Sequence, residues 1–174
     1  MKLKNKSFII LIDGPMGSGK TTVANILHLK LKRTSCIGLD KIKRFLSDFK
    51  RNPADNEISR NVVLAMTQEY LKQGINVIIE QGMKKEQIET FKKIAKKYCA
   101  DIFIYQLYAS KSLLQERVLA RPGLIGKPKI TKTRIERNYR IHTKNKHLNV
   151  PIFNSEELAP EQIANRILKE IRNL

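Results

Sequence analysis

Apolar and polar residues follow one another along the chain in blocks that are typical of strands alternating with helices. Short apolar runs predict five strands, at residues 8–13, 35–39, 76–80, 101–108 and 150–153. Stretches with apolar residues at helical spacing predict helices at about 20–32, 41–49, 56–73, 84–98, 111–120 and 131–144, and a last one from Pro160 through Ile171. This alternation predicts a three-layer α/β sandwich, in which helices cover both faces of a five-stranded parallel sheet.

Two helices allow a prediction of which face is buried. The helix at 56–73 carries Ile58, Val62, Met66 and Leu71 near helical spacing, so we expect these side chains in the core. The helix at 84–98 carries three pairs of lysines, which we expect to face water.

The composition is that of an ordinary globular protein, with 41% hydrophobic and 29% charged residues. The 174 residues are expected to form one domain, 1–174, without a membrane span or signal peptide, which predicts a cytoplasmic location. No second ligand lies at metal spacing from Cys36 or Cys99, so both are expected to pack in the core. His28, His142 and His147 likewise have no partner at metal or triad spacing.

A phosphate-binding motif follows the first predicted strand. Its eight residues fit G-x-x-x-x-G-K-[ST]: Gly14, Pro15, Met16, Gly17, Ser18, Gly19, Lys20 and Thr21, followed by Thr22. Between a strand and a helix, such a loop wraps phosphates in backbone N–H groups at a helix N-terminus. We expect Lys20 to reach the β- and γ-phosphates of ATP and Thr21 to hold Mg²⁺.

Three acidic residues fall at predicted strand ends, where ligands bind in open parallel sheets: Asp13, Asp40 and Glu80. Asp13 is expected to accept hydrogen bonds from loop backbone. Asp40 is expected to take the proton of an attacking hydroxyl, or to cap the helix at 41–49, or both. Glu80 is a candidate ligand for a Mg²⁺-bound water, a substrate-orienting carboxylate, or a structural partner for a nearby cation.

Two arginines, Arg117 and Arg121, lie four residues apart on the helix that precedes a loop at 121–130. They are candidates to grip ATP phosphates and to neutralise charge in a transition state. The alternative is a pair of solvated helix arginines.

Together, the strand–loop–helix opening, Asp40 and the pattern L-x-x-R-x-x-x-R at Leu114–Arg121 resemble the small P-loop kinases over nearly the whole chain. This group includes shikimate, gluconate and nucleotide kinases, chloramphenicol phosphotransferases, zeta-toxin-like kinases and polynucleotide kinases. The resemblance implies a lid at about 121–132 and an adenine site near Asn154 and Ser155. It is a resemblance to the superfamily, because the marks of the shikimate and adenylate kinase subfamilies are missing. The polynucleotide kinase pattern after the second strand is D-x-x-R. Counting from Asp40, this chain has Lys43 at the position of that arginine, and Arg44 follows one position later.

The charge of +18 is concentrated in one region. Residues 111–147 hold eleven Lys and Arg but only two acidic residues. Arg134, Arg137 and Arg140 recur every three residues there and predict, with Lys144, a basic stripe that could bind RNA or DNA. The single aromatic residue of this segment, Tyr139, favours folded or duplex RNA over a stacked single strand.

The function predicted from the sequence is a Mg²⁺- and ATP-dependent kinase that phosphorylates a hydroxyl, with a nucleic acid or a nucleotide as the favoured acceptor. Lys43, Arg44, Glu80, Arg134 and Arg137 join Asp40 as candidate substrate-binding residues. One alternative is a small-metabolite or antibiotic kinase. Another is a regulatory nucleotide-binding ATPase without an acceptor.

Overall fold

A computed structural model describes residues 6–122, 130–144 and 149–172. The strands are β1 (Phe8–Asp13), β2 (Thr34–Gly38), β3 (Asn76–Glu80), β4 (Asp101–Tyr108) and β5 (Ile152–Asn154). The helices are α1 (Lys20–Lys30), α2 (Leu39–Ile42), α3 (Pro53–Lys72), α4 (Lys85–Lys97), α5 (Lys111–Leu119), α6 (Lys132–Lys144) and α7 (Pro160–Arg172), with a 3₁₀ turn, η1, at Lys43–Phe45. No helix in these ranges is long and apolar enough to cross a bilayer.

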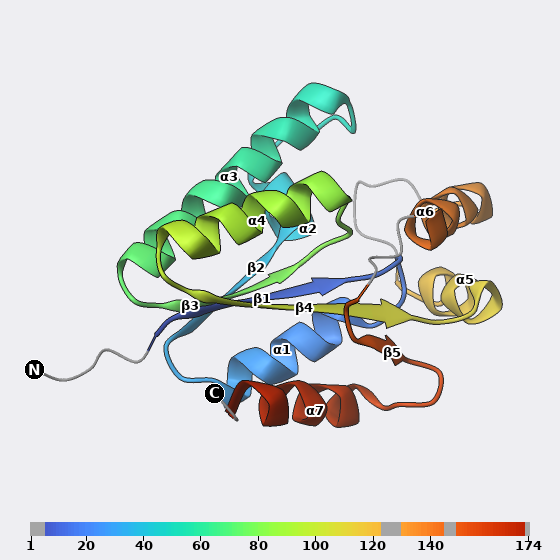
Figure 1. Cartoon of the computed structure of the whole chain (residues 1–174). Coiled ribbons are helices and arrows are strands. Elements are labelled where there is room, and N and C mark those ends of the chain that lie inside the picture. Colours follow the sequence, from blue (N-terminus) through green and yellow to red (C-terminus); the bar gives the residue numbers. More distant parts are fainter. Residues whose placement is uncertain (1–5, 123–129, 145–148, 173–174) are drawn as a thin grey trace, which may run out of the picture.

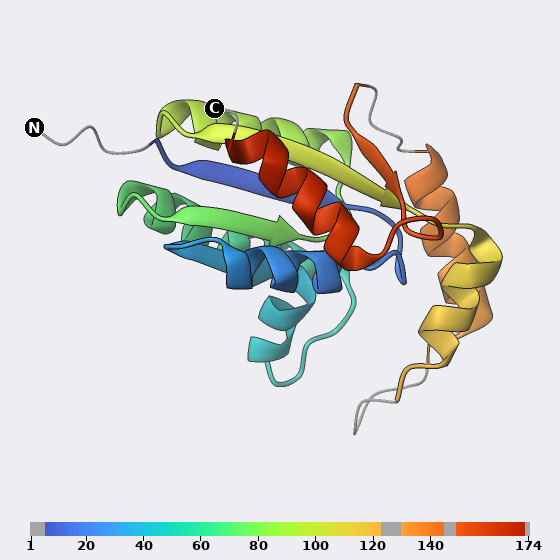
Figure 2. The ribbon, with the colours of Figure 1, turned by 90° about the horizontal axis from the view of Figure 1, so that it is seen from below.

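The five strands form one parallel sheet in the order β2-β3-β1-β4-β5, which confirms the predicted fold class. Helices α3 and α4 cover one face, and α1 and α7 cover the other (Figures 1 and 2). Helices α5 and α6 lie at the edge formed by the carboxyl ends of the strands (Figures 1 and 2). In parallel sheets this edge is where ligands bind.

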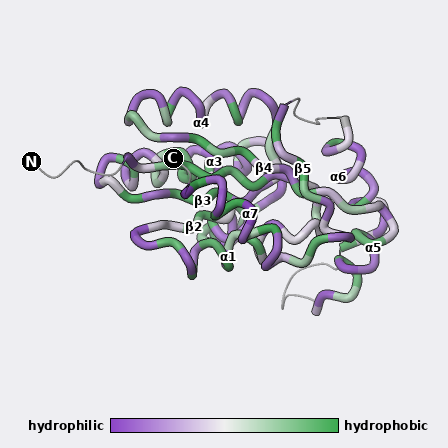
Figure 3. Tube along the Cα trace, turned by 60° about the horizontal axis from the view of Figure 1, so that its bottom comes forward, coloured by the Kyte–Doolittle hydropathy of each residue, from purple (hydrophilic) through white to green (hydrophobic). Residues whose placement is uncertain are grey.

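The central strand β1 contributes to both cores because its side chains alternate between the faces. Ile9 and Leu11 pack on the side of α3 and α4, whereas Ile10 and Ile12 pack on the side of α1 and α7. The strands are the hydrophobic centre of the molecule, and hydrophilic segments lie outside them (Figure 3). This double burial fixes the position of the loop that follows β1.

Helix α3 differs from the prediction in its start and its buried face. The Asn52 side chain accepts a hydrogen bond from the Asp55 N–H at 2.7 Å, so the helix begins at Pro53, before the predicted start at about residue 56. The buried residues are Ser59, Val63, Thr67 and Leu71. The prediction that Ile58 and Val62 are buried was wrong, since they are 53% and 37% exposed. Two buried polar residues, Ser59 and Thr67, concealed the true face because their hydroxyls bond to carbonyls of their own helix.

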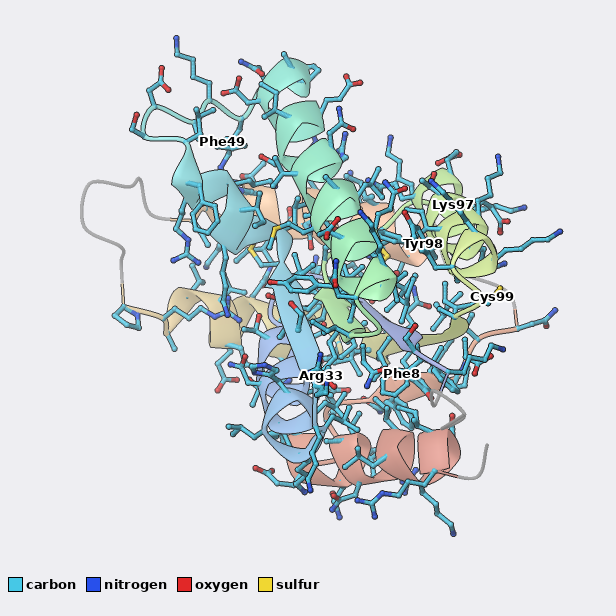
Figure 4. The ribbon with its side chains drawn as sticks, turned by 90° about the vertical axis from the view of Figure 1, so that its left-hand side faces the viewer. Phe8, Arg33, Phe49, Lys97, Tyr98 and Cys99 are labelled. Atoms are coloured by element: carbon cyan, nitrogen blue, oxygen red, sulfur yellow. The ribbon has the colours of Figure 1, made fainter. Side chains whose placement is uncertain are left out.

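The cysteines also differ from one another. Cys36 is half-buried, and burial raises the pKa of its thiol. Cys99 is exposed at the end of α4, where its φ of 51° turns the chain, so the prediction of core packing was wrong for Cys99 (Figure 4). Both thiols are free. The paired lysines of α4 are exposed, as predicted.

Candidate active site

The phosphate loop occupies the gap between β1 and α1 at the carboxyl edge of the sheet. Gly14, Gly17 and Gly19 all have positive φ, of 146°, 91° and 91°. A Cβ on Gly14 would lie 2.5 Å from the Leu107 carbonyl oxygen, so only glycine allows the loop to turn this close to β4. Ser18 is buried beneath the loop, whereas Thr22 is exposed on the first turn of α1. The loop therefore has the backbone needed to surround a phosphate.

Lys20 lies across its own loop. Its Nζ donates a hydrogen bond to the Pro15 carbonyl oxygen at 2.8 Å. Burial lowers the pKa of Lys20, while the carboxylates of Glu80, Asp13 and Asp40 act in the opposite direction. The ammonium is thus held at the mouth of the loop, where a phosphate would meet it.

Thr21 and Glu80 are brought together from α1 and the end of β3. The Thr21 hydroxyl donates to Glu80 Oε2 at 3.0 Å. Gly38, at the end of β2, makes room for this carboxylate, since a Cβ there would lie 2.5 Å from Glu80 Oε1. Burial raises the pKa of Glu80, and the nearby charge of Lys20 opposes that rise.

A hydroxyl and a carboxylate in contact at the phosphate loop are oxygen donors of the kind that Mg²⁺ uses together with water and substrate phosphates. Within the described ranges, no group of three or more His, Cys, Asp or Glu could hold a metal ion by itself. Thr21 and Glu80 therefore fit a Mg²⁺ ion that arrives with a nucleotide, with phosphates completing its coordination.

Substituting Glu80→Gln should raise the Mg²⁺ concentration needed for half-maximal phosphoryl transfer by about 10-fold or more. Because burial raises the pKa of Glu80, the wild type should lose Mg²⁺ affinity as the pH falls through that raised value, where the carboxyl gains a proton. The variant cannot titrate at this position and should lose this part of the pH dependence. Mg²⁺ titrations at several pH values test both expectations, and identical wild-type and variant profiles would contradict a metal role for Glu80.

Asp40 corrects part of the sequence-based prediction. Strand β2 ends at Gly38, and Asp40 is the second residue of α2 instead of the last residue of the strand. The N-cap of α2 is Gly38, and Asp40 lies inside the helix, so the interpretation of Asp40 as a helix cap was wrong. The carboxylate is 76% exposed and pairs with Lys43 Nζ at 3.5 Å. It is close enough to Lys20 and Glu80 to influence their charges.

A group of cations interacts with this carboxylate, directly or through Lys43 and Arg134. The Lys43 side chain is only 15% exposed and lies over the Phe49 ring, on the segment that leads into α3 (Figure 4). Burial lowers the pKa of Lys43, with Asp40 opposing and the guanidiniums of Arg51 and Arg60 reinforcing the shift. Burial likewise lowers the pKa of Arg134, which responds to the same Arg51 and Asp40. We call Lys43, Arg51, Arg60 and Arg134 the basic cluster.

Arg44, a candidate substrate-binding residue from the sequence, lies beside Asp40. Its side chain turns back and donates from Nε to the Asp40 carbonyl oxygen at 3.0 Å. It supports the turn that presents Asp40.

Asp13 ties three segments together below the phosphate loop. It is fully buried and accepts hydrogen bonds from the Met83 N–H at 2.9 Å and from Gln106 Nε2 at 3.1 Å. The prediction concerned the backbone of the phosphate loop, whereas this backbone bond comes from the loop after β3. His142 of α6 is 7% exposed, with Nδ1 3.6 Å from Asp13 Oδ1, so it is a buried residue of the site and not part of a basic surface.

The two arginines at and just after the end of α5, Arg117 and Arg121, have different surroundings. Arg117 donates from Nη1 to Ser155 Oγ at 3.0 Å and from Nη2 to the Ser155 carbonyl oxygen at 2.8 Å. It fixes the turn after β5, where Asn154 accepts from the Glu156 N–H and donates to Glu157. Arg121 is exposed and close enough to Lys20 to lower its pKa. Arg121 is therefore the arginine of this pair whose charge acts on the lysine of the phosphate loop.

Helix α6 closes over the loop on one side. The Met16 N–H donates to Asn138 Oδ1 at 2.7 Å. Arg134 is half-buried and within electrostatic range of Asp40, whereas Arg137 and Arg140 are exposed. Most of the predicted lid, residues 123–129, lies outside the described residues, as does the side chain of Lys144.

Sequence reasoning missed Gly38, Gln106, Asn138 and His142. Each acts through a partner that is distant in sequence, and a single glycine, amide or imidazole in a helix or strand carries no local pattern. The arrangement as a whole combines a phosphate loop, a hydroxyl–carboxylate pair for a cation, and an exposed carboxylate among cations. This is the chemistry needed to move a phosphoryl group to a nucleophile.

Residues 9–138 match the AAA_33 family, described as an AAA domain. Among solved structures, the fold is similar to that of the APS kinase of Mycobacterium tuberculosis in complex with AMPPNP and APS, with a TM-score of 0.72, 14% identity and coverage of 96% of this chain and 98% of that one. It is similar to the tunicamycin resistance protein of Deinococcus radiodurans, with a TM-score of 0.66, 18% identity and coverage of 95% and 96%. It is also similar to a chain of the Pnkp1/Rnl/Hen1 RNA repair complex, with a TM-score of 0.67 and 22% identity over 84% of this chain and 48% of that one.

Proposed function

The chain belongs to the AAA_33 family of AAA domains, and from this premise we propose that it is a kinase that transfers the γ-phosphoryl group of ATP to a hydroxyl. The observation that carries the proposal is the arrangement around Lys20. The Thr21–Glu80 pair lies on one side of it, and the Asp40 carboxylate lies within electrostatic range.

In the proposed reaction, the oxygen of the acceptor hydroxyl forms a bond to the γ-phosphorus, and Asp40 accepts the proton of that hydroxyl. The bond from that phosphorus to the bridging oxygen breaks, and ADP leaves with the electron pair. Lys20 and Arg121 offset the negative charge on the phosphates, and loop N–H groups hold them. Thr21 and Glu80 would hold Mg²⁺, which neutralises phosphate charge. The exposure of Asp40 suits a base that must meet an incoming substrate.

We infer that the acceptor is a nucleic acid or a nucleotide. The chain carries a net charge of +18, and two members of the basic cluster, Lys43 and Arg134, lie within electrostatic range of the proposed base. Such a charge attracts phosphate-bearing substrates. The likeness to a chain of an RNA repair complex agrees with this acceptor. A small-molecule acceptor is the second candidate, because the fold is also similar to those of the APS kinase and the tunicamycin resistance protein.

The test uses ATP radiolabelled at the γ-phosphate, with Mg²⁺ and wild-type protein. Acceptors are total tRNA, a 5′-hydroxyl oligonucleotide, a panel of nucleosides, and water alone. Label in a polymer or nucleoside supports the proposal, and label only in another small metabolite supports the second candidate. Release of free phosphate without transfer would instead indicate a regulatory ATPase, in which Asp40 has no role as a base.

A further inference from the structure

A cavity of about 320 Å³ lies between α3 and α4. Figures 1 and 2 show these two helices side by side over the same face of the sheet. Pockets for small ligands begin at about 300 Å³, so this one has room for a single compact ring system.

Gln81 gives the cavity a polar group without a partner. This residue is 5% exposed and lines the cavity, and its Oε1 is buried without a hydrogen-bond partner among the described residues. A buried carbonyl oxygen in this state costs stability, because it has lost water and gained nothing in return. A ligand that brings an N–H or O–H donor would remove this cost.

The other walls favour an uncharged, flat ligand. Two carboxylates and two cations line the cavity, Glu57 and Glu86 with Arg60 and Lys84, so their charges balance. The buried ring of Phe91 adds an apolar surface. Balanced charge, an aromatic wall and one hydrogen-bond acceptor suit a nucleobase, whose Watson–Crick edge carries N–H donors.

Two residues of the cavity wall are linked to the candidate active site. Gln81 directly follows Glu80, which accepts the Thr21 hydroxyl bond. Arg60, on its rim, belongs to the basic cluster and acts on Lys43, the partner of Asp40. Through Gln81 and Arg60, the wall of the cavity is therefore connected to the Thr21–Glu80 pair and to the partner of Asp40.

We propose that this cavity binds the base of the acceptor, an unpaired nucleoside unit, and that Gln81 Oε1 accepts a hydrogen bond from that base. The inference rests on the proposed function, and it narrows the acceptor to a free nucleoside or nucleotide, or to the unpaired terminal nucleotide of a strand. The base of a paired terminus is not available to Gln81, because its Watson–Crick edge already bonds to another base.

The test is Gln81→Met, with Gln73→Met on the exposed end of α3 as the matched control. The acceptor KM should rise about 3- to 10-fold in Gln81→Met, as expected for the loss of one hydrogen bond. The KM for ATP should not change, and the Tm of the ligand-free protein should be equal or higher, because an unpartnered buried oxygen is gone. An unchanged acceptor KM, or equal transfer to a single strand and to its blunt duplex, would overturn the proposal.

Calorimetric titration of nucleosides and of a single-stranded 5′-hydroxyl oligonucleotide separates this proposal from the kinase proposal. Comparing these two ligands also shows whether the cavity binds the base of a free nucleoside or that of a strand terminus. Saturable binding that Gln81→Met weakens, without phosphoryl transfer, would preserve the cavity as a base site and remove the kinase function. Transfer that does not depend on Gln81 would preserve the kinase and remove the base site. Absence of saturable binding for every compound would overturn the cavity proposal.

Discussion

Replacing Lys20 with alanine should reduce phosphoryl transfer by about 10²- to 10³-fold or more. The ammonium is held at the mouth of the loop by the Pro15 carbonyl, and no other described lysine lies across the loop in this way. Its removal takes away a fixed positive charge where phosphate charge develops, which is where such charges have their largest effects. Initial rates with saturating acceptor, measured over a range of ATP concentrations, give the change in kcat and KM.

Lys93→Ala is the matched control, since Lys93 is an exposed lysine on α4. Its rate should equal that of the wild type. Thermal unfolding of Lys20→Ala distinguishes lost chemistry from a lost fold. Transfer that survives in a folded Lys20→Ala protein would argue against the phosphate loop as the nucleotide site.

Substituting Asp40→Asn should reduce transfer by about 10²- to 10⁴-fold while ATP affinity stays nearly unchanged. The amide keeps the size of the side chain but cannot accept the hydroxyl proton. The pair with Lys43 is exposed on the Asp40 side, so its loss should change the free energy of unfolding by no more than about 1 kcal/mol. Transfer rates and nucleotide titrations on the same preparation measure the two effects.

Asp48→Asn, an exposed carboxylate after η1, is the control for general effects of charge. A loss of ATP binding in Asp40→Asn would indicate that Asp40 acts through the nucleotide and not as a base. Equal losses in both variants would point to the overall field of the protein.

The parts of the site that follow a local pattern could be predicted from the sequence. A buried apolar strand, three glycines and an amphipathic helix define the phosphate loop, and Glu80 ends a short apolar strand as expected. Asp40 was predicted at the end of the second strand, but it lies in helix α2, because β2 ends at Gly38, two residues before Asp40. Strand ends depend on the neighbouring strand, here β3, which pairs with β2 only as far as Gly38.

What could not be predicted depends on contacts between distant segments. The pattern on α3 favoured Ile58 and Val62 as core residues, but the packing buries Ser59 and Val63, one position further on. His142 looked like part of a basic segment, yet its ring contacts the loop after β3, where a Cβ on Gly82 would lie 2.6 Å from Nε2. Neither the buried face of α6 nor the residues that it contacts could be predicted from the sequence.

The bond between Met16 and Asn138 has a consequence for synthesis of the chain. Its two ends are 122 residues apart, so the phosphate loop reaches its final environment only after α6 has left the ribosome. Contacts of such long range form late, since a large loop of chain must close first. A nascent chain that ends before α6 would already hold the complete glycine motif without the amide that holds the Met16 N–H. Nucleotide should therefore stabilise the finished protein much more than its unfinished precursors.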